Sequence, residues 1–193
     1  MSVRPGAEPY AHDGDDVGVL LCHGFTSNPA SLRPWAEAAA GAGHTVRLPR
    51  LPGHGTTWRE MGRTTWADWL GELDAAFTEL RARSRVVVVG GLSMGGALVL
   101  RLAEDNADRV AGVVVVNPAI ATKRFDAQTG AQWGAFAART LTHSTVVDVP
   151  GVAHAAYFNP CAARVTRSFL RHPRTPDTRC VRRVHPRPFE IRP

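Results

Sequence analysis

The fold is decided by residues 85–103, which read RVVVVGGLSMGGALVLRLA. The four consecutive valines form a run that is too short for a helix of this composition and is typical of a strand buried on both faces. Residues 94–103 favour a helix. The stretch therefore predicts a strand that ends at Gly90, a sharp turn containing Ser93, and a helix that starts near Met94.

Strands and helices alternate on both sides of this stretch. Short apolar runs predict strands at residues 17–21, 45–48 and 110–116, and we expect helices at 32–40 and 65–83. Such alternation predicts an α/β protein with a mostly parallel sheet and helices on both faces. After Asn117 the pattern is less regular, and we expect a helix at 133–141, a strand at 144–149 and a helix at 161–170.

Length and composition are those of one globular domain, with 193 residues of which 44% are apolar. We expect one domain over residues 1–172 and an Arg/Pro-rich tail over 173–193. The net charge of +6 comes from this end of the chain, because residues 161–193 contain nine arginines and two acidic residues. The tail lacks the interleaved aromatic residues and the motifs of nucleic-acid binding, so we expect no nucleic-acid partner.

Several other classes are not expected. Three scattered cysteines are too few for a disulfide framework or a zinc site, and we expect no metal. No apolar run approaches the length of a membrane span, and the first sixteen residues hold no stretch typical of a signal peptide. We therefore expect a cytoplasmic protein; its oligomeric state has no signal in the sequence.

Ser93 is the first candidate for chemistry. A serine hydroxyl is a poor nucleophile unless a turn presents it to a base, and the flanking Gly91 and Gly95 permit a turn sharp enough to do so. The helix N-terminus that follows offers backbone N–H groups to a developing oxyanion.

The second candidate is Cys22-His23-Gly24-Phe25, directly after the first predicted strand. An acyl-transfer site needs a second N–H donor from a loop beside the nucleophile, and a small residue lets that backbone approach the substrate oxygen. We expect the Phe25 N–H to be this donor. His23 is interpreted as a hydrogen-bonded residue that shapes the loop.

Residues 17 to about 124 resemble the N-terminal half of the bacterial carboxylesterase and monoacylglycerol lipase group of the α/β-hydrolase superfamily. The motifs that carry the resemblance are LLCHGFTSNPASLRPWAE, RLPRLPGHG, GLSMGG and VVVVNPA. The resemblance implies that Ser93 is the nucleophile and that the N–H groups of Met94 and Phe25 form the oxyanion hole. It also implies a structural role for His54.

The base and the acid should follow Ser93 in the chain. His154 follows the predicted strand 144–149, at the strand end where open α/β sheets place their sites, and we prefer it to His143, His172 and His185. Asp126 and Asp148 are the acidic residues between Asn117 and His154. Asp126 is the better placed, because Asp148 lies within a predicted strand only six residues before His154.

The region from Phe125 to Cys180 resembles the C-terminal part of the tripeptidyl-aminopeptidase-like hydrolases of the same superfamily. RFDAQTGAQWGAFAARTL, STVVDVPGVAH and PDTRC carry this resemblance. It implies Asp126 as the acid and His154 as the base, and it suggests that Cys161 and Cys180 correspond to a disulfide pair in those proteins.

The two resemblances meet near residues 118–126, where both families place a lid and a further strand. We therefore expect an α/β-hydrolase fold that lacks the lid and one strand, with a fusion junction near 118–126. The expected activity is cleavage of small-molecule carboxylic esters through an acyl-enzyme, without a cofactor. An aminopeptidase-like amide hydrolase and a non-catalytic remnant of the fold remain as alternatives.

Overall fold

The computed structural model describes residues 3–118, 160–172 and 175–184. The chain divides into two compact units, Met1–Lys123 and Arg124–Pro193. The first contains the turn at Ser93.

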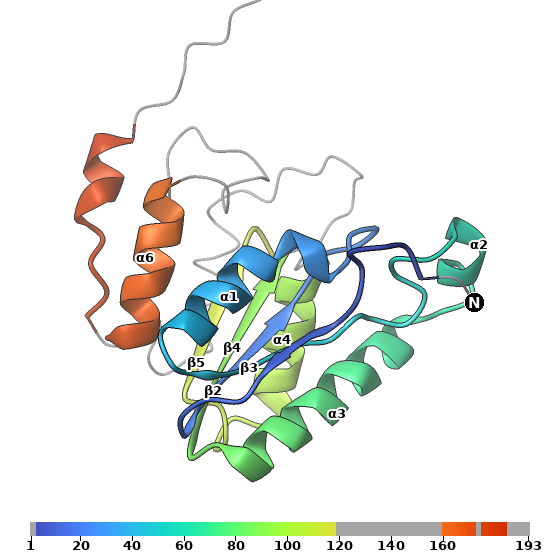
Figure 1. The fold of residues 1–193 in the computed structure, drawn as a ribbon, viewed down its shortest axis with the longest axis horizontal. Helices are drawn as coiled ribbons and strands as arrows, with labels where there is room; N and C mark the ends of the chain where they lie inside the picture. The colour runs from blue at the N-terminus through green and yellow to red at the C-terminus, as the bar shows by residue number, and fades with distance from the viewer. Residues whose placement is uncertain (1–2, 119–159, 173–174, 185–193) are drawn as a thin grey trace, which may run out of the picture. The chain divides into compact units, whose positions relative to one another are not determined.

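A twisted sheet lies at the centre of the first unit (Figure 1). Its strands in the described residues follow the order β1-β3-β2-β4-β5, and only β1 is antiparallel to its neighbour. The predicted mostly parallel sheet is thus confirmed. The strands are β1 Tyr10–His12, β2 Val17–Cys22, β3 Thr45–Leu48, β4 Val86–Leu92 and β5 Gly112–Val116.

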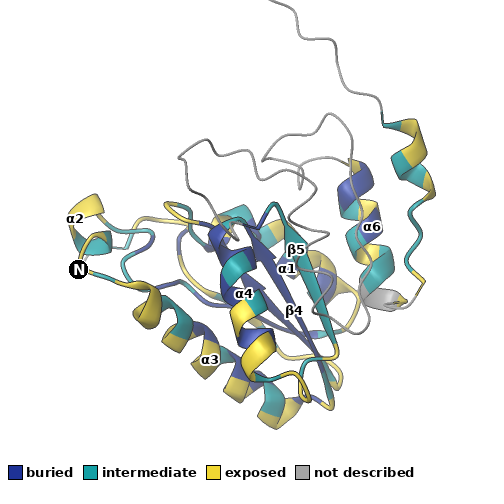
Figure 2. Cartoon of the chain, turned by 180° about the vertical axis from the view of Figure 1, so that it is seen from behind, coloured by how far each residue is buried: buried dark blue, intermediate teal, exposed yellow. Residues whose placement is uncertain are grey.

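Helices cover both faces of this sheet (Figures 1 and 2). Helix α1, Arg33–Gly41, lies on one face after the short 3-10 helix η1, Pro29–Ser31, while α3, Trp66–Arg83, and α4, Met94–Asp105, lie on the other. A short helix α2, Trp58–Met61, precedes α3. The sheet is therefore the middle layer of three, as the alternation of elements predicts.

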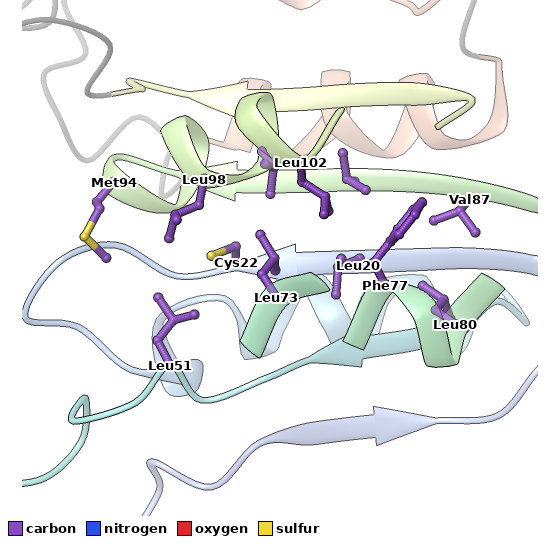
Figure 3. Close-up of a cluster of buried hydrophobic side chains, with 12 residues drawn as sticks. Leu20, Cys22, Leu51, Leu73, Phe77, Leu80, Val87, Met94, Leu98 and Leu102 are labelled. Atoms are coloured by element: carbon purple, nitrogen blue, oxygen red, sulfur yellow. The ribbon is translucent and has the colours of Figure 1, made fainter. Parts of the chain in front are cut away.

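The core lies between the sheet and helices α3 and α4 (Figure 3). Every second residue of a strand faces the same side, so Leu20 and Cys22 of β2 and Val87 and Val89 of β4 enter this core together. Phe77 of α3 packs against them with an exposed fraction of 2%. This packing holds the carboxyl ends of β2 and β4, and the loops that follow them, against one another.

Most predicted elements of this unit are confirmed, with small shifts at their ends. Strand β4 continues to Leu92, beyond the predicted end at Gly90, because Gly91 pairs with Cys22 and Leu92 with Val116. Strand β1 and helix α2 were not predicted, since elements of three and four residues carry no recognisable periodicity. The helix predicted at 133–141, the strand at 144–149 and almost all of the expected junction at 118–126 lie outside the described residues, and so does the place of the expected lid and strand.

The second unit contains α6, Pro160–Arg171, and the 3-10 helix η3, Arg179–Arg183. Helix α6 confirms the helix predicted at 161–170. Cys161 of α6 and Cys180 of η3 form a disulfide, and the Asp177 N–H donates to Ser168 Oγ at 2.6 Å. The segment predicted as an Arg/Pro-rich tail thus contains a 3-10 helix that is linked covalently to α6.

Candidate functional site

Ser93 is the one residue between β4 and α4, and its backbone has φ 57° and ψ −121°. A positive φ is rare for a residue with a side chain and costs of order 1–3 kcal/mol, so the surroundings must impose it. The Ser93 N–H donates to the Val116 carbonyl at 2.9 Å, and the Ser93 carbonyl accepts from Gly96 N–H at 2.9 Å. The turn predicted from GLSMG is therefore fixed at both ends, and Ser93 is only partly buried within it.

Glycines on both sides of Ser93 let the turn pack closely. A Cβ on Gly91 would overlap the backbone of Gly95, and a Cβ on Gly95 would overlap the carbonyl groups of Cys22 and His23. The first turn of α4 therefore lies directly on the backbone that leaves β2. A larger residue at Gly91 would displace the start of α4, and one at Gly95 would separate α4 from the backbone that leaves β2.

The loop after β2 lies beside Ser93. A Cβ on Gly24 would lie 3.9 Å from Ser93 Oγ and 3.2 Å from the Leu92 carbonyl oxygen. The loop then turns back, since the Ser27 N–H donates to the Gly24 carbonyl at 3.3 Å and Thr26 has φ 59°. The Gly24–Phe25 peptide is consequently next to the hydroxyl of Ser93.

Two backbone donors at this place have no acceptor among the residues that the structure describes. They are the N–H groups of Phe25 and Met94. Met94 is the first residue of α4, where the helix itself provides no acceptor for the N–H group. Two N–H groups that lack an acceptor in the described part of the chain, next to a hydroxyl, are chemically suited to bind the oxyanion of an acyl-transfer intermediate.

His23 is fully buried behind this loop and uses both ring nitrogens. Its Nε2 accepts the Leu51 N–H at 3.2 Å, and its Nδ1 lies 3.1 Å from the Gly24 carbonyl oxygen. Burial lowers the pKa of His23 to about 4, with smaller contributions from His54 and Arg50, while the bond to Gly24 opposes the shift. The ring is therefore neutral near pH 7.

His54 and Trp69 complete an aromatic cluster with His23 and Phe25. The ring centroid of His54 lies 5.1 Å from that of His23 and 5.3 Å from that of Trp69, and the Phe25 ring lies 6.0 Å from Trp69. The Pro52 carbonyl accepts from Trp69 Nε1 at 3.1 Å and lies 3.1 Å from His54 Nδ1. The sequence places Trp69 only on the apolar side of a helix, and no local signal indicates its contact with the loops.

The other nitrogen of His54 is buried without a hydrogen-bond partner in the described part of the chain. Burial lowers the pKa of His54, so this nitrogen carries no charge near neutral pH. Cys22, the neighbouring thiol, is fully buried, and burial raises its pKa far above the ordinary value. Cys22 is therefore unsuited to act as a nucleophile beside Ser93.

Two of the predicted site residues, Asp126 and His154, lie outside the described residues. The structure brings together Ser93, Gly24, Phe25 and Met94, all from the first unit. A groove of about 800 Å³ lies elsewhere, along β1, β3, α2 and α3, and none of these four residues lines it.

The described part of the chain contains neither a group of metal ligands nor a helix able to span a membrane. Within residues 3–118, 160–172 and 175–184, no three His, Cys, Asp or Glu side chains group as metal ligands would. The helices in these ranges include none with the length and apolar character needed to cross a bilayer.

Comparison with known proteins places this geometry in context. The chain is 50% identical over 118 residues to a thermostable monoacylglycerol lipase of Bacillus sp. (strain H-257), which is 61% of this chain and 47% of that protein. It is 32% identical over 96 residues to a carboxylesterase of Bacillus subtilis (strain 168), covering 49% of this chain and 39% of the relative. The chain thus spans about half the length, or less, of these curated relatives.

Solved structures of hydrolases also resemble this chain. One of them was reported with LipS and LipT, two metagenome-derived lipolytic enzymes. It is 46% identical to this chain with a TM-score of 0.63, and the match covers 65% of this chain and 51% of the solved one. Another, described as a predicted CIB-like hydrolase from Thermoplasma acidophilum, shares the fold with a TM-score of 0.61 at 18% identity over 84% of this chain and 87% of its own. The alpha/beta hydrolase family model matches residues 19–192. The chain belongs to the alpha/beta hydrolase family.

Proposed function

We propose that this chain hydrolyses carboxylic esters of small molecules, with Ser93 as the nucleophile. The observation that carries the proposal is the backbone of Ser93, held at positive φ between β4 and α4. Beside it lie the N–H groups of Phe25 and Met94, which have no acceptor among the described residues. Costly backbone conformations cluster at functional sites, and a strained turn from a strand into a helix is one that exposes a serine hydroxyl to a base. The names of the relatives, monoacylglycerol lipase and carboxylesterase, support an ester as the substrate.

The proposed reaction proceeds through an acyl-enzyme. Ser93 Oγ attacks the carbonyl carbon of the ester while His154 takes its proton, and the oxyanion accepts hydrogen bonds from the Phe25 and Met94 N–H groups. His154 then returns the proton to the leaving alcohol, and the ester bond breaks. Water, activated by the same base, releases the acid and restores Ser93. Asp126 orients the imidazole of His154, and no step requires a cofactor or a metal.

A second candidate is an aminopeptidase-like amide hydrolase. One observation favours it, since the Cys161–Cys180 disulfide joins the pair that the resemblance to tripeptidyl-aminopeptidase-like proteins implies. The residues around Ser93 instead match the esterase group, and we therefore place the ester first. Both candidates use the same nucleophile and oxyanion hole.

Kinetic assays with matched substrates test the proposal. We expect the chain to hydrolyse a monoacylglycerol and p-nitrophenyl esters much faster than peptide p-nitroanilides, and Ser93→Ala to abolish the activity with the fold intact. Ser84→Ala is the matched control, because Ser84 lies just before β4, whereas Ser93 follows the other end of that strand. A preference for anilides would favour the amide hydrolase, and a folded chain without either activity would be a remnant of the fold.

The acid is tested by two further variants. Asp126→Asn should lower turnover steeply, by up to about 10⁴-fold where the wrong imidazole tautomer is fixed. Asp148→Asn should lower it much less. If only Asp148→Asn is damaging, Asp148 is the acid and the proposed role of Asp126 is wrong.

A further inference from the structure

We propose that His23 is a positioning residue for the oxyanion hole and that its tautomer sets the direction of the Phe25 N–H. The proposal rests on the function proposed above. Three groups are connected in series by hydrogen bonds: the Leu51 N–H, the His23 ring and the Gly24–Phe25 peptide.

The hydrogen bonds determine which ring nitrogen carries the proton. His23 Nε2 lies 3.2 Å from the Leu51 nitrogen, whose N–H can only donate, so Nε2 must accept and has no proton. A neutral imidazole carries one N–H group, which is then on Nδ1. Nδ1 therefore donates to the Gly24 carbonyl oxygen, 3.1 Å away.

The Gly24 carbonyl belongs to the same peptide group as the Phe25 N–H. That group is planar and trans, so its N–H points opposite to its C=O. A bond that fixes the carbonyl oxygen on the His23 side therefore also directs the Phe25 N–H away from His23. Donation to the carbonyl additionally polarises the peptide and strengthens its N–H as a donor, since consecutive hydrogen bonds reinforce one another.

The far end of this chain of hydrogen bonds is anchored in the core. Leu51 is fully buried and belongs to the cluster that holds α3 and α4 on the sheet. The His23 ring is itself inaccessible to solvent and packs edge-on against His54. His23 thus holds the peptide beside Ser93 in a position fixed by the core, and it acts without contact with the reacting atoms.

Two substitutions separate the nitrogens of His23. The amide of Asn can place an N–H group near the position of Nδ1, whereas the longer amide of Gln reaches toward Nε2 and leaves the Gly24 carbonyl without this donor. His44→Gln is the matched control, because His44 lies just before β3 and pairs with Asp15. Each variant is assayed with the p-nitrophenyl ester that the wild type hydrolyses fastest.

We expect His23→Gln to lower kcat by roughly 10- to 100-fold with little change in KM, because an oxyanion donor acts mainly in the transition state. The inhibition constant of an aliphatic trifluoromethyl ketone, which forms an oxyanion on serine, should rise by the factor by which kcat/KM falls. His23→Asn should retain most of the activity, and His44→Gln all of it. A purely structural role would lower the active fraction but leave the inhibition constant unchanged.

Equal kcat for His23→Gln and the wild type, or equal losses in the Asn and Gln variants, would overturn the inference. Nitrogen-15 NMR of the wild type gives an answer that does not depend on the folding of a variant: it should show a protonated Nδ1 near neutral pH, and a protonated Nε2 would contradict the proposal. If the wild type hydrolyses no ester, the proposed function fails and this role fails with it. An active wild type with an unaffected His23→Gln variant refutes the role of His23 alone.

Discussion

The loop after β2 can approach Ser93 closely only because Gly24 has no side chain. A Cβ at this position would lie 3.3 Å from Ser93 Cβ and 3.2 Å from the Leu92 carbonyl oxygen, both on a turn that cannot move without disturbing α4. The loop would have to retreat instead, and the Phe25 N–H would retreat with it. The close approach of the two backbones is therefore what a side chain at residue 24 would remove.

We expect Gly24→Ala to lower kcat by about 10- to 100-fold, since a displacement of about 1 Å at a reacting centre has effects of this size. Gly41→Ala is the control, because a Cβ on Gly41 meets no atom within 4 Å. Ester turnover and urea unfolding should be measured on both. An active Gly24→Ala variant would mean that the loop after β2 does not supply the oxyanion donor.

The buried His23 makes stability depend on pH. Its pKa is about 4 in the folded chain against an ordinary value of 6.5, so between these values the unfolded chain binds a proton that the folded chain does not. The free energy of unfolding therefore rises with pH in this window. On acidification from about pH 6.5 towards 4, the contribution of the neutral His23 to stability is lost. The lowered pKa of His54 acts in the same direction.

Urea unfolding at pH 7 and pH 4.5 should show a loss of about 2 kcal/mol from His23 alone. His23→Gln should show a smaller difference between the two pH values than the wild type does. Equal pH dependence in His23→Gln and the wild type would show that His23 is not held neutral by burial.

At the scale of elements, local patterns predict what depends on neighbours in the sequence. The valine runs of β4 and β5 and the apolar spacing of α3 identify these elements, and the glycines around Ser93 identify the turn. The contact of Trp69 with His54 was not predictable, because it depends on how α3 packs against the loop after β3. For the same reason, the Leu51 N–H as partner of His23 could not be found from spacing.

Helix α3, which carries Trp69, begins with a reciprocal cap. Thr65 N–H donates to Asp68 Oδ2 at 2.7 Å, and Thr65 Oγ1 accepts from the Asp68 N–H. We expect Thr65→Ala to lower the free energy of unfolding by about 1 kcal/mol, because the cap satisfies donors that the helix leaves free. Thr78→Ala, an exposed position within the same helix, should change it little. Equal effects of the two in urea unfolding would show that the cap contributes nothing.

At the scale of the whole molecule, the chain consists of two units, of which the second carries the disulfide. Cys161 and Cys180 are 19 residues apart and their Cα atoms lie 5.7 Å from each other. Disulfides persist mainly in oxidising compartments. The Cys161–Cys180 bond therefore argues against the cytoplasmic compartment that the sequence predicts, and the compartment itself stays a prediction. The resemblance had suggested the pair, whereas the number and spacing of cysteines alone had not.

Removing the disulfide should affect the second unit selectively. A crosslink over a loop of this length contributes about 3 kcal/mol in the chain-entropy model. We expect Cys161→Ser with Cys180→Ser to increase amide hydrogen exchange in α6 and η3 and to leave β2 and β4 as protected as before. Unchanged exchange in α6 would show that the bond does not stabilise this unit.

The turn between β4 and α4 is proposed to make Ser93 a nucleophile, and covalent labelling shows whether it does. A fluorophosphonate reacts with an activated serine and leaves an adduct whose position mass spectrometry can assign. We expect one adduct per chain, on Ser93, that is absent from Ser93→Ala and retained in Ser84→Ala. A folded wild-type chain without an adduct, or with the adduct on another residue, would contradict it.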